Sequence, residues 1–518
     1  MAFDYVSSET AKTYSTSSAT RSQPLTLLWG DRVEVVEHDV ARQRTRVRSR
    51  GYPNEEGYGP PAVWVKDSDL GGAPILDIYF IDVGQGDAVL IVTPDWRHIL
   101  IDGGYPRRAN PTGKSAADFV DWKFFVEYGR SEIALDAMIA SHCDWDHYGG
   151  LADLLDPSEI VVGPAIDGDL DASGVTVENF YHAGLSRWTV NGAKSLGSQE
   201  PAKDGDGEVI VDLLENRKAL VDHLEGSALP ALQGEWKGFL ERVRDSRRTS
   251  GSPTGVSRLD ASDSYLPGWT PDQGNGVTIR VLGPHLAESS SGAFGLRDLG
   301  DAAINSNGHS LLLRVDYGSA RILLTGDLNK QAQQRILKDM AGQWQELAAD
   351  VAKACHHGSD KIAFEFLAAI RAGATIISSG DSEGHGHPRP AAIAASAMTG
   401  HADFDSSGDL VTPLIFSTEI ARSVRMGTVQ GLDVPARDNN PATKVTGDRL
   451  EHTWIRYQET KSGDLRPTQH QRPWGDTKII PGIIYGLVNV RTDGNKILCA
   501  TRSEKDLGWE ISTFNTRF

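Results

Sequence analysis

Four side chains that can bind a metal ion lie within six positions of the segment Ser-His-Cys-Asp-Trp-Asp-His-Tyr-Gly-Gly at residues 141–150. The segment follows an apolar stretch with the composition of a buried strand. Because alternate residues after a strand can point the same way, His142 and Asp144 can face one ion. Asp146 and His147, on the turn into the next helix, can then face a second ion. The spacing predicts a metal site with two positions.

Other candidate ligands also follow apolar stretches, further along the chain. Asp327 ends the strand-like run Leu324-Thr-Gly-Asp327 and precedes a predicted helix. The run at 350–355 leads to His356 and His357, and the run at 374–379 leads to His385 and His387. Either pair can supply a last imidazole ligand, because histidine is a common ligand of divalent ions.

The elements that must position these residues have the sequence pattern of a layered α/β protein. From Leu76 onward, long apolar strands alternate with helices. Residues 76–104 and 310–327 each predict a β-hairpin, and each hairpin is followed by a helix. These two similar halves predict an internally duplicated sandwich of sheets.

The chain divides into regions of different composition. Residues 1–22 are rich in Ser, Thr and Ala, and they predict a disordered tail. Residues 23–72 predict a small β module, and residues 73–405 predict the catalytic domain, with an insertion at about 165–275. Residues 406–518 predict a C-terminal β-rich extension, to which the sequence assigns no function.

Composition limits the classes of protein to be considered. The formal net charge of −18 over 518 residues argues against broad attraction to nucleic acid. The negative charge does not exclude a nuclease, because bound divalent ions reverse the sign of the electrostatic field inside an acidic cleft. No window approaches the roughly 18 apolar residues of a membrane span, and three cysteines do not make a disulfide framework. We therefore expect a cytoplasmic protein without a membrane partner.

Several segments resemble a known family. Residues 142–147 resemble the His-x-His-x-Asp-His signature of the metallo-β-lactamase superfamily, with Asp144 in place of the second histidine. That replacement resembles the soluble domain of ComEC-type competence DNA-uptake proteins. Five further segments resemble the same domain, in the same order along residues 76–400: Asp82-Val-Gly-Gln-Gly-Asp87, Leu100-Ile-Asp-Gly-Gly104, Leu324-Thr-Gly-Asp327, His356-His357-Gly358-Ser359 and Gly386-His387-Pro388.

The resemblance implies a fold. It implies a four-layered αββα metallo-β-lactamase sandwich, flanked by the small N-terminal β module and the C-terminal β-rich extension. The module resembles bacterial SH3-like barrels and offers a candidate surface for a protein partner. A β subdomain packed on the main core, with no binding role, is an equal alternative.

The resemblance also implies roles for single residues. Asp327 takes the place of a carboxylate that bridges two ions. His309 takes the place of the family's third histidine ligand, and His182 and His285 are alternatives for that ligand. His387 takes the place of a terminal ligand of the second ion. The catalytic assignments are Asp146, His356, His357 and Ser359. A simpler lactamase topology instead makes His356 or His357 the ligand, and Asp82 either orients a ligand histidine or stabilises a turn.

The implied activity is hydrolysis by a water activated between two divalent ions, zinc or manganese. Asp144 is a harder ligand than an imidazole, which favours manganese or magnesium. The resemblance favours a phosphodiesterase or nuclease that cleaves DNA, with nucleic acid or another phosphodiester as partner. Two alternatives stay open: a small-molecule hydrolase acting on a cyclic nucleotide, phosphoester or lactone, and a binding or sensor protein with a vestigial metal site.

Overall fold

The computed structural model describes most of the chain. The described residues are 2–23, 25–49, 62–110, 113, 115–160, 170–273, 276–380, 385–418, 427–428, 431–434, 443–446, 454–459, 468–473, 478–479, 487–502 and 509–518. The chain forms two compact units. The first consists of residues 1–381, 387–421 and 486–518, and the second of residues 382–386 and 422–485.

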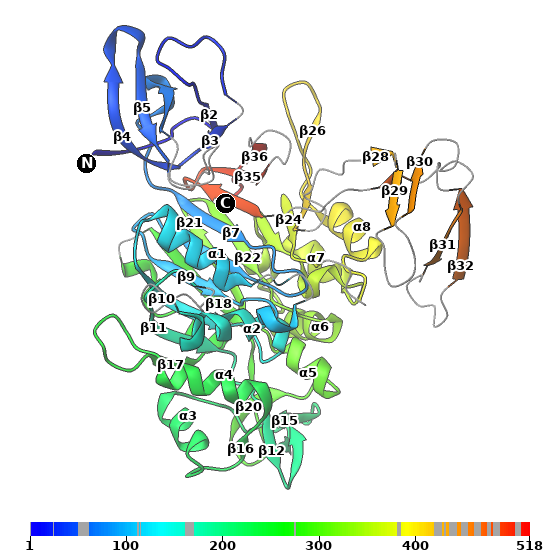
Figure 1. The fold of residues 1–518 in the computed structure, drawn as a ribbon. Coiled ribbons are helices and arrows are strands. Elements are labelled where there is room, and N and C mark those ends of the chain that lie inside the picture. The colour runs from blue at the N-terminus through cyan, green and yellow to red at the C-terminus, as the bar shows by residue number, and fades with distance from the viewer. Residues whose placement is uncertain are drawn as a thin grey trace. The chain divides into compact units, whose positions relative to one another are not determined.

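Two large sheets form the centre of the first unit (Figure 1). The nine-stranded sheet has the order β17 (Gly255–Arg258), β11 (Gly174–His182), β10 (Glu132–Ala140), β9 (His98–Ile101), β8 (Val89–Val92), β7 (Leu76–Phe80), β34 (Val488–Thr492), β35 (Lys496–Arg502) and β36 (Trp509–Asn515). The six-stranded sheet has the order β18 (Val277–Gly283), β21 (Leu312–Tyr317), β22 (Ala320–Leu324), β23 (Val351–Lys353), β24 (Ala374–Ile377) and β27 (Leu414–Ser417).

The central strands, such as β8 and β9, are almost entirely apolar because both faces of each sheet are covered. In β8, Val89 and Ile91 pack into the core between the two sheets, while Leu90 and Val92 pack under the helices on the outer face. The helices α1 (Ala116–Trp122) and α2 (Trp145–Leu154) lie on that face, and α6 (Lys330–Asp339) and α7 (Phe364–Ile370) cover the outer face of the six-stranded sheet. The predicted four-layered αββα sandwich is confirmed.

The C-terminal strands belong to this sandwich. Strand β34 pairs antiparallel with β7, and Val490 lies opposite Ile78. Strands β34, β35 and β36 complete the nine-stranded sheet, so the predicted extension at 406–518 needs correction. The pairing joins residues about four hundred positions apart, which a local pattern of apolar residues does not indicate. Part of that predicted extension lies outside the described residues.

Replacing Val490 by aspartate tests the role of these strands. Val490 is 1% exposed and packs between the two sheets, so an unpaired carboxylate there is expected to destabilise the fold by at least about 3 kcal/mol. Urea unfolding measures the change. Glu510→Gln on the edge strand β36 is the control, because Glu510 is exposed and its replacement should stay within about 0.5 kcal/mol. Equal effects in both variants would contradict the assignment.

The N-terminal region is an ordered β module. Strands β1 (Ala2–Tyr5), β4 (Arg32–Asp39), β5 (Arg44–Arg48) and β6 (Ala62–Lys66) form one sheet, and β2 (Thr10–Lys12) pairs with β3 (Thr26–Leu28). The prediction of a disordered tail at 1–22 is wrong, because β1 pairs along β4 and Ala11 of β2 is buried in the module's core. Strands this short are buried by partners that are distant in the sequence. The composition of residues 1–22 does not indicate that burial.

The insertion is shorter than predicted. Strand β11 pairs with β10 inside the main sheet and β17 pairs with β11, so the insertion comprises residues 183–254. The start of the predicted range, at 165, lies outside the described residues. The insertion contains β12 (Trp188–Val190), β13 (Ala193–Ser195), β14 (Gln199–Pro201), β15 (Glu208–Ile210), α3 (Arg217–Leu224), β16 (Ala231–Leu232) and α4 (Gly234–Asp245).

The remaining elements of the first unit are β19 (Leu286–Glu288), β20 (Phe294–Arg297), α5 (Ala302–Gly308), α8 (Pro390–Thr399), β25 (Asp403–Phe404) and β26 (Leu410–Thr412), with several short 3-10 turns. In the second unit, β28 (Gly427–Thr428) pairs with β33 (Lys478–Ile479), β29 (Gly431–Val434) with β30 (Thr443–Thr446), and β31 (Trp454–Glu459) with β32 (Thr468–Pro473). Among the described helices, none has the length and apolar character needed to cross a membrane.

Candidate metal centre

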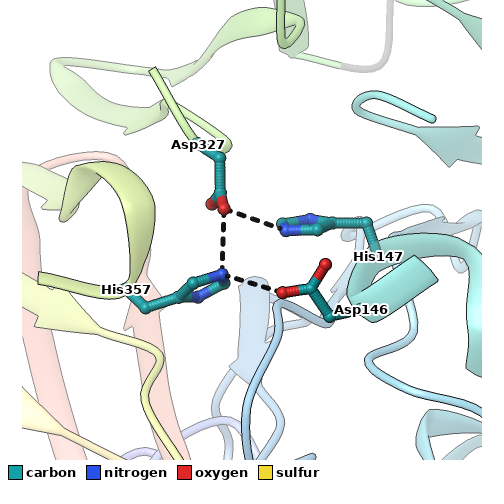
Figure 2. A group of neighbouring side chains, drawn as sticks. All are labelled: Asp146, His147, Asp327 and His357. Atoms are coloured by element: carbon teal, nitrogen blue, oxygen red, sulfur yellow. Dashed lines mark ion pairs between the residues drawn. The ribbon is translucent and has the colours of Figure 1, made fainter. Parts of the chain in front are cut away.

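Loops at the carboxyl ends of strands from both sheets bring four ligand-type side chains together. Figure 2 shows Asp146 and His147 from the start of α2, Asp327 after β22 and His357 after β23. One ligand atom from each lies within 4.8 Å of all the others. We call these four residues the metal cluster. Its position fits the general rule that ligands of α/β sheets bind beyond the carboxyl ends of the strands.

Asp327 is the centre of the cluster. Its Oδ2 lies 2.9 Å from His357 Nε2 and 3.2 Å from His147 Nε2. His357 Nε2 also lies 3.6 Å from Asp146 Oδ2. Both imidazoles are fully buried, while the Asp146 side chain is 19% exposed. The cluster is therefore accessible from the side of Asp146.

Local structure holds each loop in place. Asn329 caps α6 by accepting a hydrogen bond from Ala332 N at 3.1 Å, so Asp327 lies in the turn just before the helix. Gly149 and Gly150 let α2 pack closely, because a Cβ on Gly150 would lie 2.1 Å from the carbonyl oxygen of Gly103.

Buried hydrogen-bond acceptors hold the Nδ1 side of the two imidazoles, opposite the Nε2 atoms that face the cluster. His147 Nδ1 donates to Asp102 Oδ2 at 2.9 Å. His357 Nδ1 lies 3.2 Å from both the Ser378 carbonyl oxygen and Asp87 Oδ1. Metal-binding histidines usually donate their second ring nitrogen in this way, which turns the other nitrogen toward the ion. Asp102 orients the ligand histidine, whereas Asp82 accepts from Gly84 N within its own turn.

The turn that carries His357 has an unusual backbone. His356, His357 and Gly358 have φ values of 47°, 53° and 78°. Residues other than glycine rarely adopt positive φ, and consecutive cases concentrate at functional sites. This conformation brings His357 into the cluster and leaves the His356 side chain 21% exposed, with its Nε2 3.8 Å from Asp327 Oδ2.

The donor set fits a divalent ion. The Nε2 atoms of His142, His147 and His357 are buried, and although carboxylate oxygens lie nearby, none of the three makes a well-aligned hydrogen bond among the described residues. Buried polar atoms are rarely left in that state unless they serve another purpose. Two imidazoles and two carboxylates are a ligand set that zinc and manganese both accept. The cluster residues would hold such an ion.

The charges within the cluster are strongly coupled. Burial alone would lower the pKa of His147 and of His357, but Asp327 and neighbouring carboxylates raise both well above the usual range. Burial would raise the pKa of Asp327, but His357 and His147 hold it well below its usual range. Without a metal, the cluster is therefore held by two imidazolium groups facing carboxylates.

Comparison with known proteins gives a family match for the segment that contributes Asp146 and His147 to the cluster. Residues 81–229 match the family described as the metallo-beta-lactamase superfamily. This segment, which is less than half of the chain, is similar to the metallo-β-lactamase superfamily. Similarity to this superfamily supports a metal-dependent hydrolase, since the superfamily typically binds divalent metals. No curated protein matches the chain.

Two solved structures are similar to parts of the chain. One is a motif mutant of a metallo-beta-lactamase from Cronobacter sakazakii (Enterobacter sakazakii), with 13% identity, a TM-score of 0.22, and coverage of 55% of this chain and 82% of that one. The other is described as a metal-dependent hydrolase of the beta-lactamase superfamily, with 13% identity, a TM-score of 0.30, and coverage of 66% and 95%. The finer resemblance to ComEC-type proteins stays a prediction.

Other residues predicted for the site lie beside the cluster. The ring of His142 lies tilted against that of His147, with 4.0 Å between the ring centroids, and His142 Nε2 lies 3.7 Å from Asp144 Oδ2. The ring of His387 lies 5.8 Å from that of His356 and 6.2 Å from that of His357. The prediction made His387 the ligand and His357 catalytic, but the structure places His357 in the cluster and His387 next to it.

Four predicted or alternative residues lie outside the cluster. His309 ends α5 and its Nε2 donates to the Arg297 carbonyl oxygen at 2.8 Å, which corrects its assignment as a ligand. His182 Nδ1 accepts from Gly184 N at 3.0 Å. His285 and Ser359 are likewise no part of the cluster. Among the described residues, no histidine fills the predicted third position.

The sequence alone did not predict Lys353, a buried lysine beside the cluster. Lys353, which is 2% exposed, forms an ion pair with Asp87 and lies 3.5 Å from Asp327 Oδ1. Its Nζ also donates to the Gly326 carbonyl oxygen at 2.8 Å. The sequence feature that could have indicated this residue is a single lysine in the otherwise apolar run Val351-Ala-Lys353-Ala-Cys355. A buried lysine requires a carboxylate partner, and Asp87 supplies it.

Metal binding to this cluster is expected to release about two protons per ion at pH 7, because His147 and His357 have raised pKa values and must lose their protons to bind a metal. Affinity should consequently rise with pH. Calorimetric titration in buffers of different ionisation enthalpy measures the release. In the control His142→Ala the number should not change, because burial lowers the pKa of His142 and leaves it neutral. A binding enthalpy that does not change with the ionisation enthalpy of the buffer would contradict the prediction.

Proposed function

We propose that this chain is a metal-dependent phosphodiesterase that cleaves DNA. The observation that carries the proposal is the position of Asp327, whose Oδ2 faces two buried imidazoles in a cluster that Asp146 leaves accessible. A divalent ion bound there supplies an activated water and stabilises charge on the leaving oxygen. The resemblance of the surrounding segments to ComEC-type domains supports DNA as the substrate.

The residues of the chain have separate tasks in this proposal. Asp146, His147, Asp327 and His357 hold the metal, and Asp102 keeps the His147 ring in position. His356 is partly exposed beside Asp327, and burial lowers its pKa, so the ring is neutral at pH 7. A neutral imidazole donates one hydrogen bond, which suits contact with a phosphate oxygen of the substrate.

Cleavage of linear single- and double-stranded DNA tests the proposal, with manganese or zinc added to metal-free protein. We expect cleavage that depends on metal and is lost in Asp146→Ala and in His147→Ala. Asp156→Ala is the matched control, because this carboxylate follows α2 and pairs with Arg242. DNA left intact by a folded, metal-loaded protein would refute DNA as the substrate. Unchanged binding of a partner by Asp146→Ala, without any turnover, would favour the sensor alternative.

One observation favours a small phosphodiester as a second candidate. Arg187, from the insertion, reaches Asp144 beside the cluster, so the insertion covers one side of the site. A covered site accepts small substrates more readily than duplex DNA. Turnover of bis(p-nitrophenyl) phosphate that DNA does not inhibit would support this candidate, whereas competitive inhibition by an oligonucleotide would support the nuclease.

A further inference from the structure

The two sides of the site differ in their ligands. On one side, the metal cluster offers two imidazoles and two carboxylates within 4.8 Å of one another. On the other side, the described residues offer only His142 and Asp144 of their own, since His309 is bonded to the Arg297 carbonyl oxygen, and a third ligand would have to be Asp327, shared with the metal cluster. Structural zinc sites normally use four protein ligands, and catalytic sites use at least three. The second side is incomplete by that standard.

The carboxylate on the incomplete side already has partners. Asp144 Oδ1 accepts short hydrogen bonds from Arg187 Nη2 and from Ser306 Oγ. Arg187 Nε also points to the Cys143 carbonyl oxygen, at 3.4 Å. The guanidinium is therefore fixed against the signature segment from two directions, and Asp144 is engaged before any metal binds.

Arg187 brings a permanent positive charge to this position. An arginine keeps its proton at all accessible pH values, and it neutralises a carboxylate that it bonds directly. A divalent ion on Asp144 would lie close to this guanidinium, and the two like charges would repel one another. The pair of Arg187 and Asp144 thus opposes tight binding of a metal on the His142 side.

We propose that Arg187 supplies the positive charge on the side of His142 and Asp144 in place of a second tightly bound metal, so that the chain holds one ion tightly in the metal cluster. This proposal rests on the metal-binding part of the proposed function and is independent of the substrate. It assigns a function to the insertion, because Arg187 lies five residues after β11 leaves the main sheet. The insertion would therefore determine how many ions the site holds.

Metal stoichiometry tests the proposal without any measurement of activity. Purified full-length chain is titrated with cobalt(II), whose absorption reports coordination, and its metal content is measured after dialysis. We expect about one tightly bound ion per chain in the unmodified protein and about two in Arg187→Ala, because the released Asp144 can then join His142 and the shared carboxylate of Asp327 as a ligand. The double variant Arg187→Ala/His142→Ala should return to about one ion.

Two controls keep the result interpretable. Arg187→Lys retains the positive charge and should keep about one ion. Arg242→Ala removes another insertion arginine, which bonds the Ala152 carbonyl oxygen, and it should leave the stoichiometry unchanged. Two tightly bound ions in the unmodified protein, or one ion in a folded Arg187→Ala variant, would overturn the proposal. If the chain binds one ion tightly but does not cleave DNA, DNA is refuted as the substrate and the proposal on Arg187 still holds.

Discussion

Asp327→Asn is expected to abolish tight metal binding and to reduce hydrolysis by about 10³-fold. Asp327 Oδ2 is the one cluster atom that lies close to both His147 Nε2 and His357 Nε2, and Asp327 Oδ1 faces Lys353. An asparagine keeps the shape but removes the negative charge. A loss of about 4 kcal/mol of stabilisation in the transition state corresponds to that reduction in rate.

Two comparisons make this result specific. Asp339→Asn changes a carboxylate at the end of α6 that pairs with Arg335, and it should keep full metal content and activity. Asp102→Asn removes only the acceptor behind His147, and metal affinity should fall by about 10- to 100-fold. If Asp327→Asn kept its metal while Asp102→Asn lost it, the central position of Asp327 would be refuted.

The sequence predicted the parts of the site that are local. Asp146 and His147 belong to one short segment, and Asp327 follows a recognisable strand, so spacing and strand order indicate residues that the structure brings together, while their binding of a metal stays a prediction. The layered fold was also predictable, because apolar runs and helices alternate over a long stretch. Such signals depend on neighbours within a few positions.

The remaining features depend on conformation or on distant contacts. The choice of His357 over His387 follows from positive φ values at residues 356–358, which residue types do not indicate. The position of His309 follows from a hydrogen bond to Arg297, which a spacing argument does not include. The strands at 488–515 pair with the start of the domain, and no local pattern predicts that pairing.

Buried charge was the hardest feature to predict from the sequence. A lysine within an apolar run indicates an edge or a partly exposed strand, since lysine is almost never fully buried unless it is paired. Lys353 is nevertheless buried, because Asp87 from the other sheet reaches it. The cluster therefore depends on an ion pair whose partners are more than 260 positions apart.

Lys353→Met is expected to lower the free energy of unfolding of the metal-free protein by about 3–5 kcal/mol. Removing one partner of a buried ion pair leaves the other charge without compensation, and that is costly even though the intact pair adds little net stability. Here two carboxylates, Asp87 and Asp327, lose the ammonium group between them. Urea unfolding in the presence of a chelator measures the change.

The double variant Lys353→Met/Asp87→Asn separates this cause from a loss of packing. It removes both charges of the pair at nearly constant volume, so it should be more stable than Lys353→Met alone. Saturating zinc should also recover part of the loss in the single variant, because a bound ion supplies positive charge to Asp327 and stabilises the folded state by mass action. If the double variant were as unstable as the single one and zinc had no effect, the ammonium of Lys353 would have no electrostatic role in the cluster.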